Sequence, residues 1–112
     1  MPIYDCFMYF DEDVMLDLRL HTLDEYVDTF VIAEATRDHA GKEKKLNFDH
    51  KNFLKFENKI KYLIIDDLPI NVKSKKKNWS PNHSRDQHQR NSLTKGFENC
   101  GENDLIMISD ID

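Results

Sequence analysis

The residues of this sequence most suited to chemistry are two carboxylates near its end. Asp110 and Asp112 come directly after the apolar run Leu105–Ser109, with Ile111 between them. Alternate residues of an extended segment project to the same side, so the two carboxylates can bind one hard cation. Mg²⁺ or Mn²⁺ held by one or two carboxylates together with phosphate oxygens is a common arrangement. The Asp-Ile-Asp triplet therefore predicts a divalent metal site.

Acidic residues also follow two other apolar runs. Glu34 comes after Phe30–Ala33, and the pair Asp66 and Asp67 comes after Leu63–Ile65. Ligands of open parallel sheets bind at the carboxyl ends of the strands, so these acids are expected at one rim with the triplet. The alternative is that Asp66 and Asp67 only mark the end of a strand and cap the next helix.

A basic residue is expected near the triplet. The apolar stripe Leu93, Phe97 and Cys100 is typical of one helix face, and helical spacing extends that face backward to polar residues, which are Asp86, Gln89 and Arg90. An inward Arg90 is either paired with a structural carboxylate or directed at an anionic ligand. We favour the ligand, because this helix leads into the strand that ends before Asp110.

Alternating strand and helix signals surround these residues. The apolar runs predict strands over about 3–9, 29–34, 60–65 and 104–109, the last three read as covered on both faces. A helical stripe follows the first strand and consists of Leu16, Leu20, Leu23 and Val27, with Asp13 as its expected N-cap. Thr22 and Glu25 form a capping box, which allows a second short helix in the same segment.

Asp49 is expected to cap a helix over about 50–58 that packs through Phe53, Leu54 and Phe56. A third helix over about 84–99 is expected to stop at a left-handed Gly101. Residues 36–47 and 69–83 are expected to be loops. The order predicts a single α/β domain over residues 1–112 with a mainly parallel sheet flanked by helices.

Composition excludes several classes of function. The net charge of −5 argues against binding long nucleic acid, although residues 39–95 are basic. No run is long enough for a membrane span and no secretory signal precedes the first strand, so we expect a cytoplasmic protein. Cys6 and Cys100 are expected to be buried thiols, and the five histidines lack zinc spacing.

Several separated motifs, in order, resemble glycosyltransferase family 17, which includes the β-1,4-mannosyl-glycoprotein 4-β-N-acetylglucosaminyltransferase. The likeness covers nearly the whole chain. The matching segments are Ile3–Phe10 with Glu12, Leu16–Leu20, Val27–Ala35 with Gly41 and Lys42, Asp66–Pro69, Trp79 with Gln89–Asn91, and Leu105–Asp112.

The resemblance implies a GT-A-like nucleotide-sugar fold, a UDP-sugar donor such as UDP-GlcNAc, Mn²⁺ or Mg²⁺, a glycan or other sugar acceptor, and inversion at the sugar carbon. It implies that Asp110 and Asp112 hold the metal and the ribose or diphosphate of the donor. Glu34 would approach the uracil and Arg90 would stabilise the diphosphate. Glu12 and Gln89 complete the expected donor-binding set.

Two alternatives stay open. A metal-dependent phosphohydrolase would use an Asp to attack phosphorus, but its Asp-x-Asp would follow the first strand instead of the fourth. Because the chain stops at Asp112, we also expect it to be the N-terminal part of a longer domain, with the general base beyond residue 112. By itself this piece is then expected to give no useful turnover, and an inactive fragment is the non-enzymatic alternative.

Overall fold

The fold is built on one sheet of four parallel strands, in the order β3-β2-β1-β4. The computed structural model describes residues 2–38, 40–68, 81–97 and 100–111. The strands are β1 (Ile3–Tyr9), β2 (Thr29–Ala35), β3 (Ile60–Ile65) and β4 (Leu105–Ser109). These bounds confirm the predicted strands to within a residue, and the parallel sheet with flanking helices confirms the α/β prediction.

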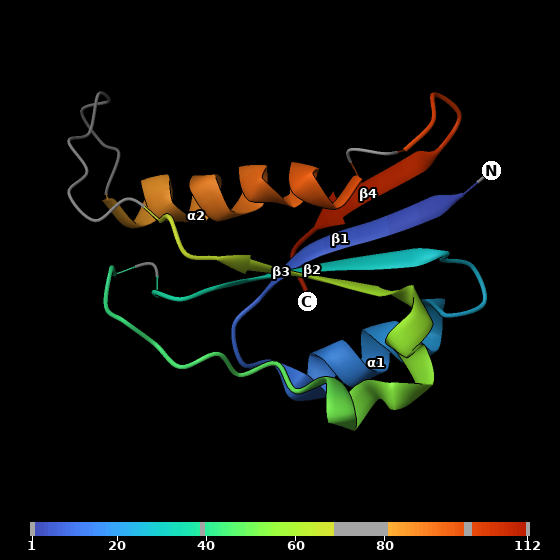
Figure 1. Ribbon diagram of the computed structural model, residues 1–112, viewed down its shortest axis with the longest axis horizontal. Coiled ribbons are helices and arrows are strands. Elements are labelled where there is room, and N and C mark those ends of the chain that lie inside the picture. Colours follow the sequence, from blue (N-terminus) through green and yellow to red (C-terminus); the bar gives the residue numbers. More distant parts are fainter. Residues whose placement is uncertain (1, 39, 69–80, 98–99, 112) are drawn as a thin grey trace.

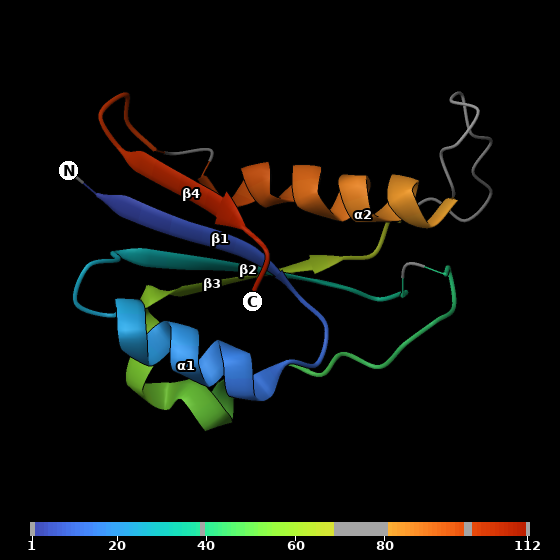
Figure 2. The same ribbon diagram turned by 180° about the vertical axis from the view of Figure 1, so that it is seen from behind.

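Helices cover the two faces of the sheet (Figures 1 and 2). One face carries α1 (Asp13–Leu23) and the 3₁₀ helix η1 (His50–Lys59), and the other carries α2 (Pro81–Ser92), which continues into the 3₁₀ helix η2 (Leu93–Phe97). The chain moves from β1 to β2 to β3 in one direction and then returns past β1 to β4. Right-handed crossovers place the returning helix on the opposite face. The strand order therefore reverses between β1 and β4.

Two cores lie on the two faces, because alternate residues of a strand point in opposite directions. In β2, Phe30 and Ile32 face α1 and η1, whereas Val31 and Ala33 face α2 and η2, and all four are fully buried. The expectation of a strand covered on both faces is confirmed for β2. It is wrong for β3 and β4, which lie at the two edges of the sheet and leave some of their apolar side chains exposed.

The first helix is one helix rather than two. Leu16 and Leu20 are fully buried as predicted, but Val27 lies beyond the helix, which ends at Leu23. Asp13 is not the N-cap, because it is already the first helical residue and accepts a hydrogen bond from the Tyr9 hydroxyl. The side chain of Asp13 therefore connects α1 to the end of β1.

The cap of the second helical segment is where the sequence places it. The Asp49 carboxylate accepts a hydrogen bond from the Lys51 N–H at 3.0 Å, satisfying a backbone donor that has no partner inside the helix. Phe53 and Phe56 are buried, as predicted, but Leu54 is 59% exposed, so its predicted packing role is wrong. The segment is 3₁₀-helical but kinked at Phe53, whose φ of −132° is not helical, and a three-residue turn spaces its faces differently from an α-helix.

The third helix is longer at its start than predicted. It begins at Pro81, so residues 81–83 are helical and not a loop, and proline suits the first helical turn, where its missing N–H costs nothing. The remainder of the predicted loop, residues 69–80, lies outside the described residues. Gly101 is not left-handed: among the described glycines only Gly41 has a positive φ, of 89°. The expected left-handed stop at Gly101 is therefore wrong.

The cysteines are both free thiols. Cys6 is fully buried in β1, and its burial raises the pKa of the thiol to about 12, so it stays protonated at neutral pH. Cys100 is only partly buried, contrary to the expectation that both are core residues. Among the described residues, no helix is long and apolar enough to cross a membrane.

Close packing between η2 and β2 depends on a glycine. A Cβ placed on Gly96 would lie 2.3 Å from Cγ1 and 2.9 Å from Cγ2 of Val31, which is fully buried. Because a β-branched side chain in a strand has few alternative rotamers, Val31 cannot turn away at low cost. We expect Gly96→Ala to lower the free energy of unfolding by about 1–3 kcal/mol, measured by urea denaturation.

Two further variants test that explanation. At Gly101 an added Cβ would come no nearer than 3.7 Å to its neighbour Asp104, so Gly101→Ala should change stability far less. Val31→Ala should recover part of the loss in the Gly96→Ala background, giving a coupling between the two sites. Equal destabilisation by Gly101→Ala, or strict additivity of Gly96→Ala with Val31→Ala, would contradict the packing argument.

Candidate functional site

A pocket opens where the strand order reverses, at the carboxyl ends of the strands. In an open α/β sheet this is the place where ligands bind, because loops diverge there to opposite faces. The pocket has a volume of about 180 Å³, less than the roughly 300–1,000 Å³ usual for whole ligands, so it would hold one part of a larger molecule. Its lining residues are Met8, Tyr9, Phe10, Glu12, Ala35, Arg37, Lys44, Gln89, Asp110 and Ile111.

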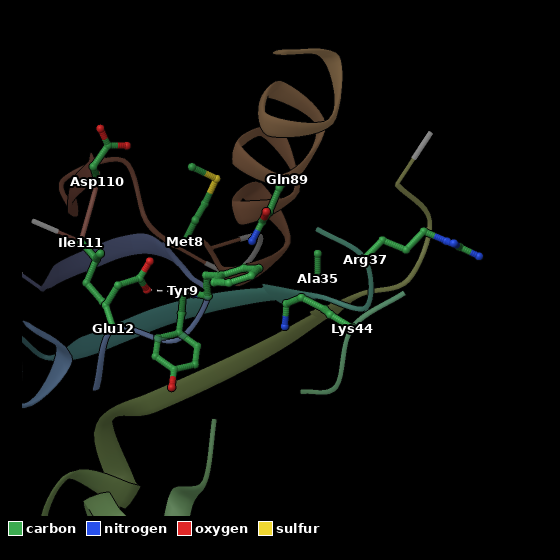
Figure 3. A pocket seen from close by; sticks show the side chains of 10 residues that line it. Met8, Tyr9, Glu12, Ala35, Arg37, Lys44, Gln89, Asp110 and Ile111 are labelled. Atoms are coloured by element: carbon green, nitrogen blue, oxygen red, sulfur yellow. Dashed lines mark hydrogen bonds between the residues drawn. The ribbon is translucent and has the colours of Figure 1, made fainter. Parts of the chain in front are cut away.

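Charge is divided across this pocket. Figure 3 shows Asp110 and Ile111 on one side, and Arg37 and Lys44 on the other, with the guanidinium of Arg37 pointing away from the pocket. Glu12 lies near Ile111 in the same view, which adds a second carboxylate to the acidic side. An anionic ligand would be attracted by the basic side, but its approach to the acidic side would require a cation between them.

The acidic side is formed by the segment that follows β4. The Asp110 side chain is 64% exposed, and its Oδ1 accepts a hydrogen bond from Nη2 of Arg90 in α2 at 2.8 Å. Ile111, the next residue, is 8% exposed and packs into the core on the α1 face. The structure thus pairs Arg90 with the carboxylate of Asp110, whereas Asp112 lies outside the described residues.

Glu34 occupies a different position from the expected rim. It lies inside β2 and is fully buried, where its carboxylate accepts hydrogen bonds at 2.7–3.0 Å. The donors are Lys44 Nζ, the backbone N–H groups of Asn47 and Phe48, and the Tyr62 hydroxyl. Glu34 does not line the pocket itself; it holds Lys44, which does.

Burial affects the phenol beside that carboxylate. The pKa of Tyr62 is raised, first by burial and then by its hydrogen bond to Glu34. The raised pKa extends the pH range over which the hydroxyl stays protonated and donates to the carboxylate. The Glu34 cluster is therefore a satisfied polar network that fixes residues 44–48 against the sheet.

The other two expected donor-binding residues both line the pocket. The Glu12 carboxylate accepts hydrogen bonds from the N–H groups of Phe10 at 2.9 Å and Asp11 at 3.2 Å, which orient it in the turn after β1. Gln89 is 4% exposed, and its Nε2 donates to the carbonyl of Ala33 in β2 at 3.1 Å. This hydrogen bond joins a pocket residue of α2 to β2.

Sequence reasoning missed the cations of the pocket. Arg37 and Lys44 come from residues 36–47, which the sequence indicated only as a loop of mixed charge. Within this loop Arg37 Nη1 donates to the Gly41 carbonyl at 3.0 Å, and the guanidinium of buried Arg85 lies close above Gly41. The available signal was position: a loop following a parallel strand at its carboxyl end is expected to contact ligand.

The pair after β3 contributes no pocket residue. Asp67 accepts a hydrogen bond from His88 at 2.9 Å in an exposed position, and this hydrogen bond lowers the pKa of Asp67. The interpretation of these acids as markers of a strand end agrees with that placement.

The donor set is compatible with a hard divalent cation. Among the described residues there is no group of three or more histidine, cysteine or acidic side chains that could hold a metal. Mg²⁺ and Mn²⁺ need no such group when a diphosphate supplies oxygen ligands, because one or two carboxylates then suffice. The exposed carboxylate of Asp110 meets that requirement.

Comparison with known proteins gives one family. The model of the family described as Glycosyltransferase family 17 matches residues 1–112. No curated protein and no solved structure matches the chain.

Proposed function

Because the chain belongs to glycosyltransferase family 17, we propose that its pocket binds the donor of an inverting transfer, a UDP-sugar such as UDP-GlcNAc, together with Mn²⁺ or Mg²⁺. The family makes the protein a glycosyltransferase that uses a sugar donor and an acceptor.

The observation that supports this proposal is the arrangement of charge at the switch point of the sheet. A diphosphate would lie between the basic side, with Arg37 and Lys44, and the acidic side, with Glu12 and Asp110. Without a cation, the two carboxylates would repel it. Binding of the donor is therefore expected to depend on the metal.

Specific residues receive specific roles in the proposed site. Asp110 and Asp112 would hold the cation, and Arg90, already hydrogen-bonded to Asp110, would contact the diphosphate. When bound, the metal would neutralise negative charge that develops on the departing UDP. Glu12 and Gln89 would contact the donor, and Glu34 would act by holding Lys44 at the pocket.

The acceptor side of the reaction is assigned to another part of the enzyme. We propose that residues 1–112 are the donor-binding portion and that the general base, which takes the proton of the acceptor hydroxyl, lies beyond residue 112. The described pocket, at about 180 Å³, has room for only one part of such a ligand, which fits this division. Weak donor binding without useful turnover is expected of these residues by themselves.

The test is a titration of the 112-residue protein with UDP, monitored through the NMR signals of the backbone amides. With Mg²⁺ present, UDP should shift the amides of Phe10, Arg37 and Ile111, which belong to the pocket and its rim. Replacing Mg²⁺ with a trace of Mn²⁺ should broaden the signals nearest Asp110, because Mn²⁺ is paramagnetic. Adding EDTA should weaken binding at least about tenfold.

Uridine serves as the matched ligand control. It has the same base and ribose but no diphosphate, so its binding should not depend on the metal. If UDP fails to perturb the pocket, or binds equally well with EDTA, the proposed donor site is wrong.

A further inference from the structure

Arg19 lies outside the pocket and connects α1 with β1 and with the end of β4. Arg19 lies on α1, and its side chain is 12% exposed. Its Nε and Nη2 donate to the two carboxylate oxygens of Asp5 at 2.8 and 2.7 Å, and its Cζ lies 4.4 Å from the centre of the Phe7 ring. Asp5 is 1% exposed and lies in the central strand β1, paired with residues of both β2 and β4. The guanidinium is therefore held in place by two side chains of β1, Asp5 and Phe7.

The same guanidinium also holds the segment that carries the proposed metal ligand. Nη1 donates to the carbonyl oxygen of Asp110 at 2.6 Å, and Nη2 donates to the Ser109 hydroxyl at 2.5 Å. Both partners are about ninety residues away in sequence. The planar fork of arginine spreads its donors over three nitrogens and so reaches acceptors that lie apart, whereas the three donors of a lysine ammonium all lie on one nitrogen.

We propose that Arg19 is a positioning residue of the donor site, an inference that rests on the proposed function. It fixes the backbone at Ser109 and Asp110, and so would limit the positions from which the Asp110 carboxylate could bind the cation. Two other contacts hold the same segment: Arg90 binds the carboxylate from α2, and Ile111 packs into the core. Arg19 donates to the carbonyl oxygen of Asp110 and not to its carboxylate, so its effect on the metal site passes through the backbone.

Arg19→Lys is the principal test, because it keeps a positive charge beside buried Asp5 while removing the fork. Supporting groups around a metal ligand typically affect metal affinity by about 10–100-fold. We expect Arg19→Lys to raise the Kd of UDP measured with Mn²⁺ about tenfold, with the Kd of UDP measured in EDTA unchanged. Amide hydrogen exchange at Asp110 and Ile111 should be faster in the unliganded protein, whereas exchange in β1 should not change.

Ser109→Ala is the second variant, since it removes one acceptor of Arg19 and leaves the Asp5 pair intact. It should shift the same two measurements in the same direction by a smaller factor. Lys59→Gln is the control. Lys59 also connects a distant segment to α1, because it binds Asp24 at the end of that helix, and its hydrogen bond and ion pair do not involve residues 109–111. It should leave both measurements unchanged.

The outcomes separate this inference from the proposed function. If the unmodified protein shows no metal-dependent binding of UDP, the proposed function and the inference both fail. If it does, and Arg19→Lys and Ser109→Ala bind UDP with Mn²⁺ as tightly as the unmodified protein, the inference alone fails. Should Arg19→Lys not fold, unchanged binding by Ser109→Ala is enough to overturn the inference.

Discussion

Replacing Asp110 with Asn is expected to lower the rate of sugar transfer at least about a hundredfold in the enzyme that contains these residues. The change removes one negative charge and keeps the size and the carbonyl oxygen that can accept from Arg90, so the contacts at 2.8 Å to Arg90 and 2.6 Å to Arg19 can persist. What is lost is the carboxylate that would hold the cation. Stabilisation of a leaving diphosphate by a metal amounts to several kcal/mol, and each 1.36 kcal/mol is a factor of ten in rate.

The measurement is release of UDP from the proposed UDP-sugar donor at saturating Mn²⁺, compared with Asp104→Asn. Asp104 is also an acid beside β4, but it precedes the strand and accepts a hydrogen bond from the N–H of Gly101. Its substitution should leave the rate within about twofold, as is usual for a change away from the site. Transfer by Asp110→Asn at the rate of the unmodified enzyme would exclude Asp110 as a metal ligand.

The Glu34→Gln variant should be strongly destabilised, by about 3–5 kcal/mol. The carboxylate is fully buried, and its four donors include the ammonium group of Lys44, whose side chain is 10% exposed. Glutamine replaces one acceptor oxygen by a donor group, which would face Lys44 and the N–H of Asn47. Leaving a buried charge without its partner is among the most costly substitutions known in proteins.

Urea denaturation is the appropriate measurement, with Glu43→Gln as its control. Glu43 also pairs with a cation, Arg37, but at 3.3 Å and with its own side chain 83% exposed. Such surface pairs contribute about 0–1 kcal/mol, so the control should unfold close to the unmodified midpoint. A loss below about 1 kcal/mol for Glu34→Gln would mean that water satisfies the network after substitution, contrary to its burial.

Local signals in the sequence were sufficient for the order of the elements. A strand buried on both faces must be continuously apolar, and Phe30–Ala33 is such a run. Asp49 was recognisable as a cap because a cap bonds to a backbone N–H only two or three residues away. Asp110 could also be placed from the local sequence, because the residue that follows an apolar strand lies at the carboxyl edge of a parallel sheet.

The position of Glu34 was decided by strand length and register. The sequence presents it as an acid that follows an apolar run, but β2 continues to Ala35, and Glu34 pairs with Tyr9 of β1 and Ile64 of β3. One more residue of pairing therefore moves the carboxylate from the rim into the sheet, and the two-residue period of the strand directs it to the α1 face. Neither neighbouring strand is close to it in sequence, so no local pattern could reveal this.

The contacts of Arg19 depended on the tertiary structure in the same way. Fourteen residues separate it from Asp5 and ninety-one from Asp110, so a sequence pattern shows only a polar residue on a helix with buried leucines. The contacts of Arg19 result from the parallel pairing of β1 with β4, which brings Asp5 and the end of β4 within reach of one side chain of α1. Periodicity can report which residues face the core, because burial acts on each residue locally. It cannot report which distant polar groups meet there, because that depends on how the strands are ordered and aligned in the sheet.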